Sequence, residues 1–216
     1  MENSIETAQL LFKNNKYQET TDTCNRILAV NPNSVEALKL ISKSFLATQK
    51  IEDARLYLKK ILNIKPNDYE SIKDLGNTYQ AVGDTRSAKD YYLKAIAINN
   101  YYAPALTNLG LIELETGNKQ EALSLLKKAT EYDPQLIQAW GNLANFYFKS
   151  GMVKEAEIAC HRLLTINPNM FNFNFLLANI LITQNKLKEA ETALRKTIQL
   201  KPDFFHAHLN LGAILK

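Results

Sequence analysis

The strongest constraint on the fold is a proline that recurs with a period of 34 residues. Prolines occupy positions 32, 66, 134, 168 and 202, and Asn100 stands at the one position of this period where proline is missing. These six are called the period positions. A strict repeat of this length is typical of stacked arrays, in which each unit packs on its neighbours instead of around one central core. The sequence therefore predicts a single array over residues 1–216.

Two other kinds of residue keep the same period. A small residue lies twelve residues before each period position: Thr20, Ala54, Ala88, Ala122, Ala156 and Ala190. Seventeen residues before each period position lie Asn15, Gln49, Gly83, Gly117, Gly151 and Asn185. Gly and Asn tolerate a positive φ, so the second series predicts a turn, and the first allows two helices to approach closely. Gln49 is the exception, where we expect strain or a different turn.

Each repeat is predicted to be a helix, a turn and a second helix that stops before the proline. The residue before a proline is pushed out of the α region, which ends the helix there. The predicted repeats are 1–34, 35–68, 69–102, 103–136, 137–170 and 171–204, with a partial or capping helix at 205–216. The run Phe171–Phe175 alternates with asparagine as a strand would, but the repeat register predicts a helix.

These features resemble the tetratricopeptide repeat family, whose pattern is W-x2-L-G-x2-Y, A-x3-F and P. The repeat 137–170 carries Trp140, Leu143, Ala144, Tyr147, Ala156, Cys160 and Pro168 at these positions. The resemblance implies an all-α fold, a right-handed α-solenoid of stacked antiparallel helix pairs forming a superhelix. It also implies a scaffold that binds a protein or peptide in a concave groove lined by the first helix of each repeat.

By resemblance, the groove is lined by residues two, five, six, nine and twelve of each repeat. The predicted peptide-binding residues at these positions are Lys73, Asn77, Asn108, Leu111, Asn142, Asn145, Phe148, Asn179 and Asn210. An asparagine amide both donates and accepts, which suits the backbone of an extended peptide. Asparagine is also common elsewhere in the chain, so composition is the alternative explanation of this pattern.

Two members of the family offer closer analogies. The asparagines at 108, 142 and 210 are similar to the ladder in the repeat arm of O-linked N-acetylglucosamine (O-GlcNAc) transferases, although Asp74 and Leu176 interrupt it. Chaperone-binding members grip a peptide carboxylate with lysine, asparagine and arginine. Lys73, Asn77 and Asn108 match that set, whereas Gln138 and Asn142 are neutral where cations are usual, so we expect carboxylate binding to be weak.

Enzymatic chemistry has no visible basis in the sequence, and we predict neither a cofactor nor a metal site. His206 and His208 are two apart on a helix, so they point in different directions. Cys24 and Cys160 share one repeat position and are predicted to be buried, apolar in character and unbridged. The net charge of +4 comes from scattered charges, which argues against nucleic-acid binding. No signal peptide or membrane span is visible, so we expect a cytoplasmic protein without membrane insertion.

Two alternative functions stay open beside the peptide-binding scaffold. Similar arrays precede glycosyltransferase, sulfotransferase or hydroxylase domains, so the chain is alternatively the N-terminal substrate-recognition arm of a larger enzyme. The helix at 205–216 lacks a second helix of its own repeat, and we expect the natural chain to continue. The other alternative is a self-assembling scaffold that associates through its end repeats. A fold does not fix a function by itself.

Overall fold

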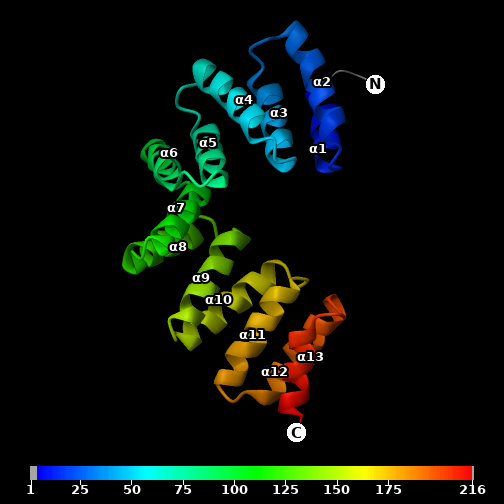
Figure 1. Cartoon of the computed structure of the whole chain (residues 1–216), viewed down its shortest axis with the longest axis vertical. Coiled ribbons are helices and arrows are strands. Elements are labelled where there is room, and N and C mark those ends of the chain that lie inside the picture. Colours follow the sequence, from blue (N-terminus) through cyan, green and yellow to red (C-terminus); the bar gives the residue numbers. More distant parts are fainter. Residues whose placement is uncertain (1–3, 216) are drawn as a thin grey trace. The chain divides into compact units, whose positions relative to one another are not determined.

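The structure, a computed structural model, describes residues 4–215, which form thirteen α-helices and no strand (Figure 1). The helices are α1 (Ile5–Lys13), α2 (Tyr17–Val30), α3 (Val35–Ala47), α4 (Ile51–Ile64), α5 (Tyr69–Ala81), α6 (Thr85–Ile98), α7 (Ala103–Glu115), α8 (Lys119–Tyr132), α9 (Ile137–Lys149), α10 (Val153–Ile166), α11 (Phe171–Thr183), α12 (Leu187–Leu200) and α13 (Phe205–Ile214). The prediction of an all-helical chain of helix pairs is confirmed. The alternating Phe171–Phe175 segment forms the start of α11, as the register predicted.

The chain divides into two compact bodies between Ala105 and Leu106, here called the N-terminal body and the C-terminal body. In the N-terminal body each helix from α1 to α6 packs against the next one along the chain. In the C-terminal body the same is true from α8 to α13. Packing between sequence neighbours is the contact pattern expected of a helical solenoid.

The turn inside each helix pair has the backbone that the sequence predicted. The residues with positive φ are Asn15 (59°), Gln49 (58°), Gly83 (80°), Gly117 (87°), Gly151 (73°) and Asn185 (59°). Gln49 thus adopts the same left-handed conformation as the others, so the alternative of a different turn is wrong there. Its N–H donates to the Leu46 carbonyl at 3.1 Å, which keeps the helix end satisfied.

The small residues that keep the period are all fully buried. Thr20 and the alanines at 54, 88, 122, 156 and 190 are 0% exposed. The Thr20 hydroxyl donates to the Lys16 carbonyl at 2.8 Å, so its polar group costs little inside the contact. These positions let the second helix of each pair lie close to the first.

Each body has its own apolar core. In the N-terminal body, Leu38, Leu58 and Leu75 pack together across three helices. In the C-terminal body, Leu126, Leu143, Tyr147, Cys160 and Ile180 belong to one cluster. The cysteines are free and fully buried, one in each body, as predicted. Burial raises the pKa of the Cys24 thiol to about 11 and that of Cys160 to about 12.

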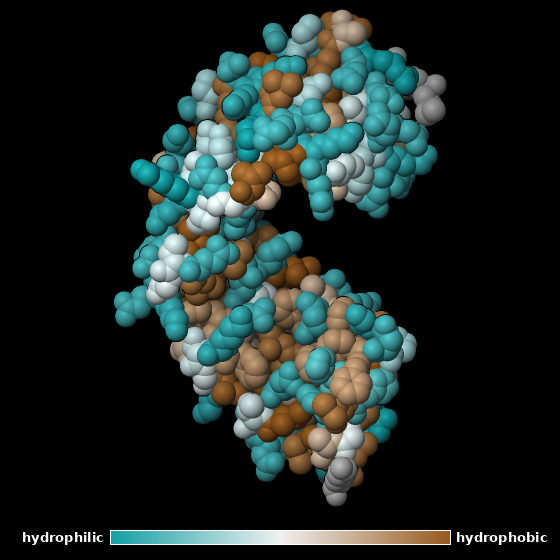
Figure 2. Space-filling view, viewed as in Figure 1, coloured by the Kyte–Doolittle hydropathy of each residue, from teal (hydrophilic) through white to brown (hydrophobic). Residues whose placement is uncertain are grey.

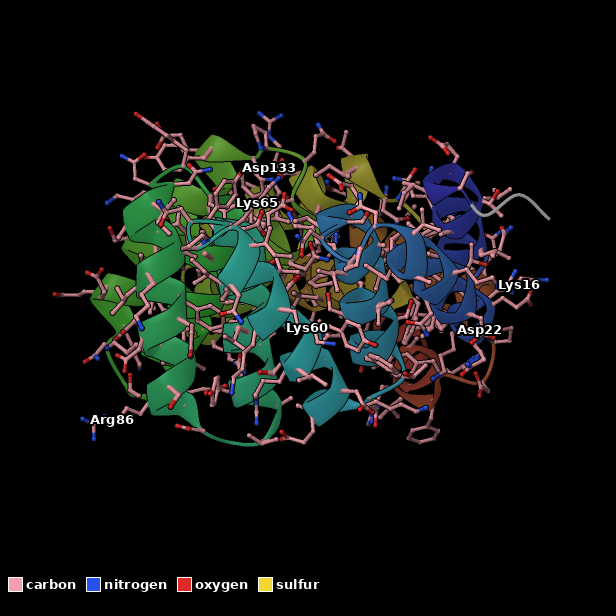
Figure 3. The ribbon with its side chains drawn as sticks, turned by 90° about the horizontal axis from the view of Figure 1, so that it is seen from above. Lys16, Asp22, Lys60, Lys65, Arg86 and Asp133 are labelled. Atoms are coloured by element: carbon pink, nitrogen blue, oxygen red, sulfur yellow. The ribbon has the colours of Figure 1, made fainter. Side chains whose placement is uncertain are left out.

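Charged side chains project from many different helices. Four exposed examples are labelled in Figure 3: Lys16 immediately before α2, Asp22 within α2, Lys60 on α4 and Arg86 on α6. None of the helices in residues 4–215 is long and apolar enough to cross a membrane. Within the same residues, no three His, Cys, Asp or Glu side chains are grouped so that they could hold a metal ion.

Candidate functional site

Two of the predicted groove residues, Lys73 and Asn77, lie on α5 in the N-terminal body. The Lys73 ammonium pairs with the carboxylate of Asp74, which is largely buried. The Asn77 side chain lies 3.3 Å from the same carboxylate and 2.8 Å from the Tyr92 hydroxyl, which donates to it. Asp74 therefore offsets the charge on Lys73, a contact that the sequence pattern alone did not reveal. Lys73 should therefore attract the carboxylate of a guest peptide less strongly than a lysine without an acidic partner would.

Most of the other predicted residues lie on first helices of the C-terminal body and surround two hollows. The first, here called the Asn142 hollow, encloses about 520 Å³. Its lining includes the predicted Leu111, Asn142 and Asn145, together with Leu114, Lys119, Phe146, Lys149 and Ser150. It thus combines amide groups with an apolar floor from α7 and α9.

The amide groups of the Asn142 hollow differ in what they have left to offer. The Asn145 Nδ2 donates to the Gly141 carbonyl of its own helix at 3.0 Å, which fixes the side chain and leaves its Oδ1 to accept. Asn142 is half-buried and has no hydrogen bond from its side chain to another described residue. Asn142 is therefore the stronger candidate to bond a guest backbone in both directions.

The second hollow, here called the Asn210 hollow, encloses about 280 Å³ between α9, α11 and α13. It contains the predicted Phe148, Asn179 and Asn210, with Ile182, Thr183, Ala213 and Ile214 beside them. The Asn210 Nδ2 donates to the Asn179 Oδ1 at 2.8 Å, so the two amides form a pair across neighbouring first helices. The pair leaves the Asn179 Nδ2 group to donate and the Asn210 Oδ1 atom to accept.

The structure does not bring all nine predicted residues together. Asn108, on α7, is half-buried and lines neither hollow. Lys73 and Asn77 lie on α5 in the N-terminal body. The hollows thus contain six of the nine predicted residues, and whether any of them binds a guest stays a prediction.

Sequence reasoning missed two lysines at the Asn142 hollow. Lys119 is the first residue of α8, outside the first helices, and Lys149 is the last residue of α9. Both are exposed, neither forms an ion pair within the described residues, and no acidic side chain lines this hollow. Lys149 falls one position beyond the twelfth residue of its repeat, so a wider window along the helix would have found it. The two lysines give the hollow a positive edge that favours an anionic group.

Apolar side chains are exposed on one face of the C-terminal body. On the face drawn in Figure 2, brown side chains gather over the C-terminal body, where α9 to α13 lie. Exposed apolar side chains on α13 include Phe205, 68% exposed, and Leu209, 56% exposed. Phe205 and Leu209 lie one helical turn apart, and adjoining exposed apolar side chains commonly mark a binding or association site.

Comparison with known families finds three matches, and each is to a model described as tetratricopeptide repeat. The matched residues are 73–137, 113–169 and 171–204. Together they cover more than half of the chain. None of the curated proteins matches the sequence.

Solved structures of low sequence identity share the fold. The Cut9–Hcn1 hetero-tetramer of the APC/C superimposes with a TM-score of 0.85 at 18% identity, over 98% of this chain and 42% of that one. This chain therefore spans less than half the length of that relative. A structure of pilF from Pseudomonas aeruginosa gives 0.81 at 13% identity, covering 97% of this chain and 95% of that one. YrrB, described as a TPR protein with an unusual peptide-binding site, gives 0.61 at 18% identity, covering 87% and 96%.

Proposed function

Because this chain belongs to the tetratricopeptide repeat family over residues 73–204, we propose that it is a non-catalytic scaffold that binds an extended segment of another protein. The proposed groove runs along the first helices of the C-terminal body. One observation carries the proposal: both hollows on these helices combine predicted asparagines with apolar neighbours. The peptide-binding site described for YrrB is a property of that protein, and it adds support by analogy.

The chemistry of the two hollows defines the guest. Asn142 and the Asn179–Asn210 pair offer amide donors and acceptors to the backbone of an extended peptide. Leu111 and Phe146 in one hollow, and Phe148 in the other, offer apolar contact to its side chains. Backbone bonds hold a chain without demanding a sequence, so selectivity comes from the apolar contacts.

The lysines add a preference for charge. Lys119 and Lys149 flank the Asn142 hollow without an acidic residue among its lining. We therefore propose that the guest carries an aspartate, a glutamate or a phosphorylated residue next to its apolar anchors. Such a contact lies near the surface, so its contribution falls as salt rises.

The experiment that tests this function compares peptide binding by matched variants. An array of immobilised peptides screened with the intact chain identifies binders, whose affinities are then measured in solution. Asn142→Ala should weaken binding about threefold to tenfold, since a neutral hydrogen bond contributes about 0.5–1.5 kcal/mol. Asn25→Ala, at an exposed asparagine on α2, is the control and should bind as the unsubstituted protein does.

Two further measurements complete the test. Lys149→Gln should reduce the affinity for acidic binders and flatten its dependence on salt, while circular dichroism stays unchanged. Equal affinity of the unsubstituted, Asn142→Ala and Lys149→Gln proteins for every binder would refute the proposed groove.

A further inference from the structure

A third hollow in the C-terminal body lies outside the proposed groove. It encloses about 310 Å³ between α8, α9 and α10 and is called the Tyr147 hollow. Its lining includes Trp140, Leu143, Tyr147, Ile158 and Ala159, and it shares no lining residue with the other two hollows. Two of its three helices are second helices of their repeats, so it faces a different side of the pairs.

The register of the repeats explains why this hollow exists. In the pair α3–α4, Phe45 contacts Tyr57 with ring centroids 5.6 Å apart. In the pair α5–α6, Tyr79 stacks on Tyr91 with centroids 5.2 Å apart and planes 10° apart. In each case the two rings are separated by twelve positions along the chain.

The equivalent residues of the pair α9–α10 are Tyr147 and Ala159, again separated by twelve positions. The tyrosine is kept, but its partner ring is replaced by a methyl group. Both residues line the hollow, so the space next to Tyr147 corresponds to the ring that the pairs α3–α4 and α5–α6 supply themselves. A flat group from another molecule would fit where that ring is missing.

The walls of the Tyr147 hollow are held in place before any guest arrives. The Trp140 Nε1 donates to the Pro134 carbonyl at 3.0 Å, which fixes the orientation of the indole. Tyr147 is buried among the core residues of this body, and Leu143 is almost fully buried. Ile158, by contrast, is 60% exposed and gives the opening an apolar edge. A prearranged apolar cavity loses little conformational entropy on binding.

The charges at the opening are predominantly negative. Glu131 and Glu155 both line the hollow, and neither forms an ion pair within the described residues. Burial raises the pKa of Tyr147, and the nearby carboxylate of Glu155 raises it further. Lys127 lies one helical turn before Glu131 and offsets part of one charge. A cation therefore complements the opening better than a neutral or anionic group.

We propose that the Tyr147 hollow binds the arginine side chain of a partner protein. A guanidinium is flat and stays cationic at neutral pH, and its three-carbon stem suits the apolar edge. The chain itself provides a precedent, because the Arg55 guanidinium lies over the ring of Tyr79, the register equivalent of Tyr147, at 4.4 Å from its centroid. In the complex the guanidinium stacks on Tyr147 and forms ion pairs with Glu131 and Glu155.

Trp140 reports on this site without interference, because it is the one tryptophan in the chain. The experiment follows its indole N–H signal by NMR during titration of the intact chain with N-acetyl-arginine methylamide. The matching lysine and tyrosine compounds serve as comparators. We expect saturable shifts with the arginine probe and an affinity for the lysine probe about fivefold weaker, since lysine lacks a flat group.

Two variants test the shape and the charge of the Tyr147 hollow separately. Ala159→Tyr supplies the missing ring, as at Tyr57 and Tyr91, and should abolish the response to arginine while circular dichroism and the melting temperature show a folded chain. The double variant Glu131→Gln, Glu155→Gln keeps the cavity and should weaken arginine binding about tenfold through loss of charge. Glu121→Gln, at an exposed glutamate on α8 outside the hollow, is the matched control.

The proposal is independent of the groove, so Asn142→Ala should leave the arginine response unchanged. It is overturned if the Trp140 signal does not respond to the arginine probe, or if the tyrosine probe binds equally well, which would identify an aromatic guest. Arginine binding that survives both the Ala159→Tyr and the double glutamine substitutions would also overturn it.

Discussion

Gln49 shows how one side chain departs from the preference of its position without changing the fold. Its φ of 58° lies in the left-handed region, where a residue with a Cβ atom other than Asn or Asp is disfavoured. The packing of α3 against α4 determines the turn, so Gln49 adopts this φ despite the backbone strain. The sequence identified the position but left strain and a changed turn both open, because the choice depends on the packing of the two helices, which the repeat pattern does not contain.

Replacing Gln49 with glycine should therefore stabilise the N-terminal body by about 0.5–1 kcal/mol. Relief of backbone strain in the folded state stabilises it, and the larger conformational entropy of glycine in the unfolded state offsets part of this gain. The reverse change, Gly117→Ala, should destabilise by about 1 kcal/mol. A Cβ atom at Gly117 would meet nothing within 4 Å, so this effect is conformational and not steric. Urea denaturation of both variants measures the difference, and a destabilising Gln49→Gly would contradict the account.

Helices of neighbouring repeats are joined by polar contacts that no repeat pattern predicts. Glu157 on α10 accepts from the Lys186 ammonium at 2.7 Å and from the Gln184 amide at 2.8 Å, both at the turn before α12. The hydrogen bond from Lys186 lowers the pKa of Glu157, against the opposing effect of burial. The contact therefore links α10 to the turn between α11 and α12.

The lowered pKa gives this contact a defined dependence on pH. A carboxyl whose pKa is lower in the folded state stabilises the protein above its unfolded pKa, and that contribution disappears as pH falls through the folded value. Lys186→Met should cost about 0.5–1 kcal/mol at pH 7, a modest amount because Lys186 is partly exposed, and progressively less toward pH about 4. Denaturation across this range tests it, with Lys188→Met on exposed α12 surface as control. A cost that does not change with pH would exclude the ion pair as its source.

Helix positions and turns could be predicted from the sequence because they depend on local periodicity. Proline, glycine and alanine at fixed spacing determine where a helix ends, where the chain reverses and where two helices touch. The candidate site could be predicted only in part. The Lys73–Asp74 pair, the Asn179–Asn210 bond and the approach of Lys119 to the Asn142 hollow depend on side-chain rotamers and on distances between helices, which a one-dimensional register does not contain.

Association of the chain with itself is a proposal that rests on α13. Gly76 and Gly110 each face a large side chain of the following helix, Tyr92 and Leu126 respectively, whereas nothing lies within 4 Å of a Cβ at the equivalent Gly212. The same helix exposes Phe205 and Leu209. This apolar face is open to a helix from another copy.

If this proposal holds, the mean mass should rise with concentration for the unsubstituted protein. Phe205→Ser with Leu209→Ser should abolish the rise, because the apolar area that drives association is removed. Leu56→Ser, at a leucine 52% exposed on α4, is the matched control and should associate as before. Light scattering across a concentration series measures the effect, and a constant mass for the unsubstituted protein would rule the interface out.

Chemical modification of the buried thiols can measure the local unfolding of each body. Cys24 and Cys160 occupy the same place in their repeats, are enclosed completely and ionise only at high pH. An alkylating reagent can reach either sulfur only when the surrounding helices separate. The rates at which the two sites are modified in the natural sequence therefore report the local unfolding of the two halves independently, and reveal whether they come apart together or one at a time.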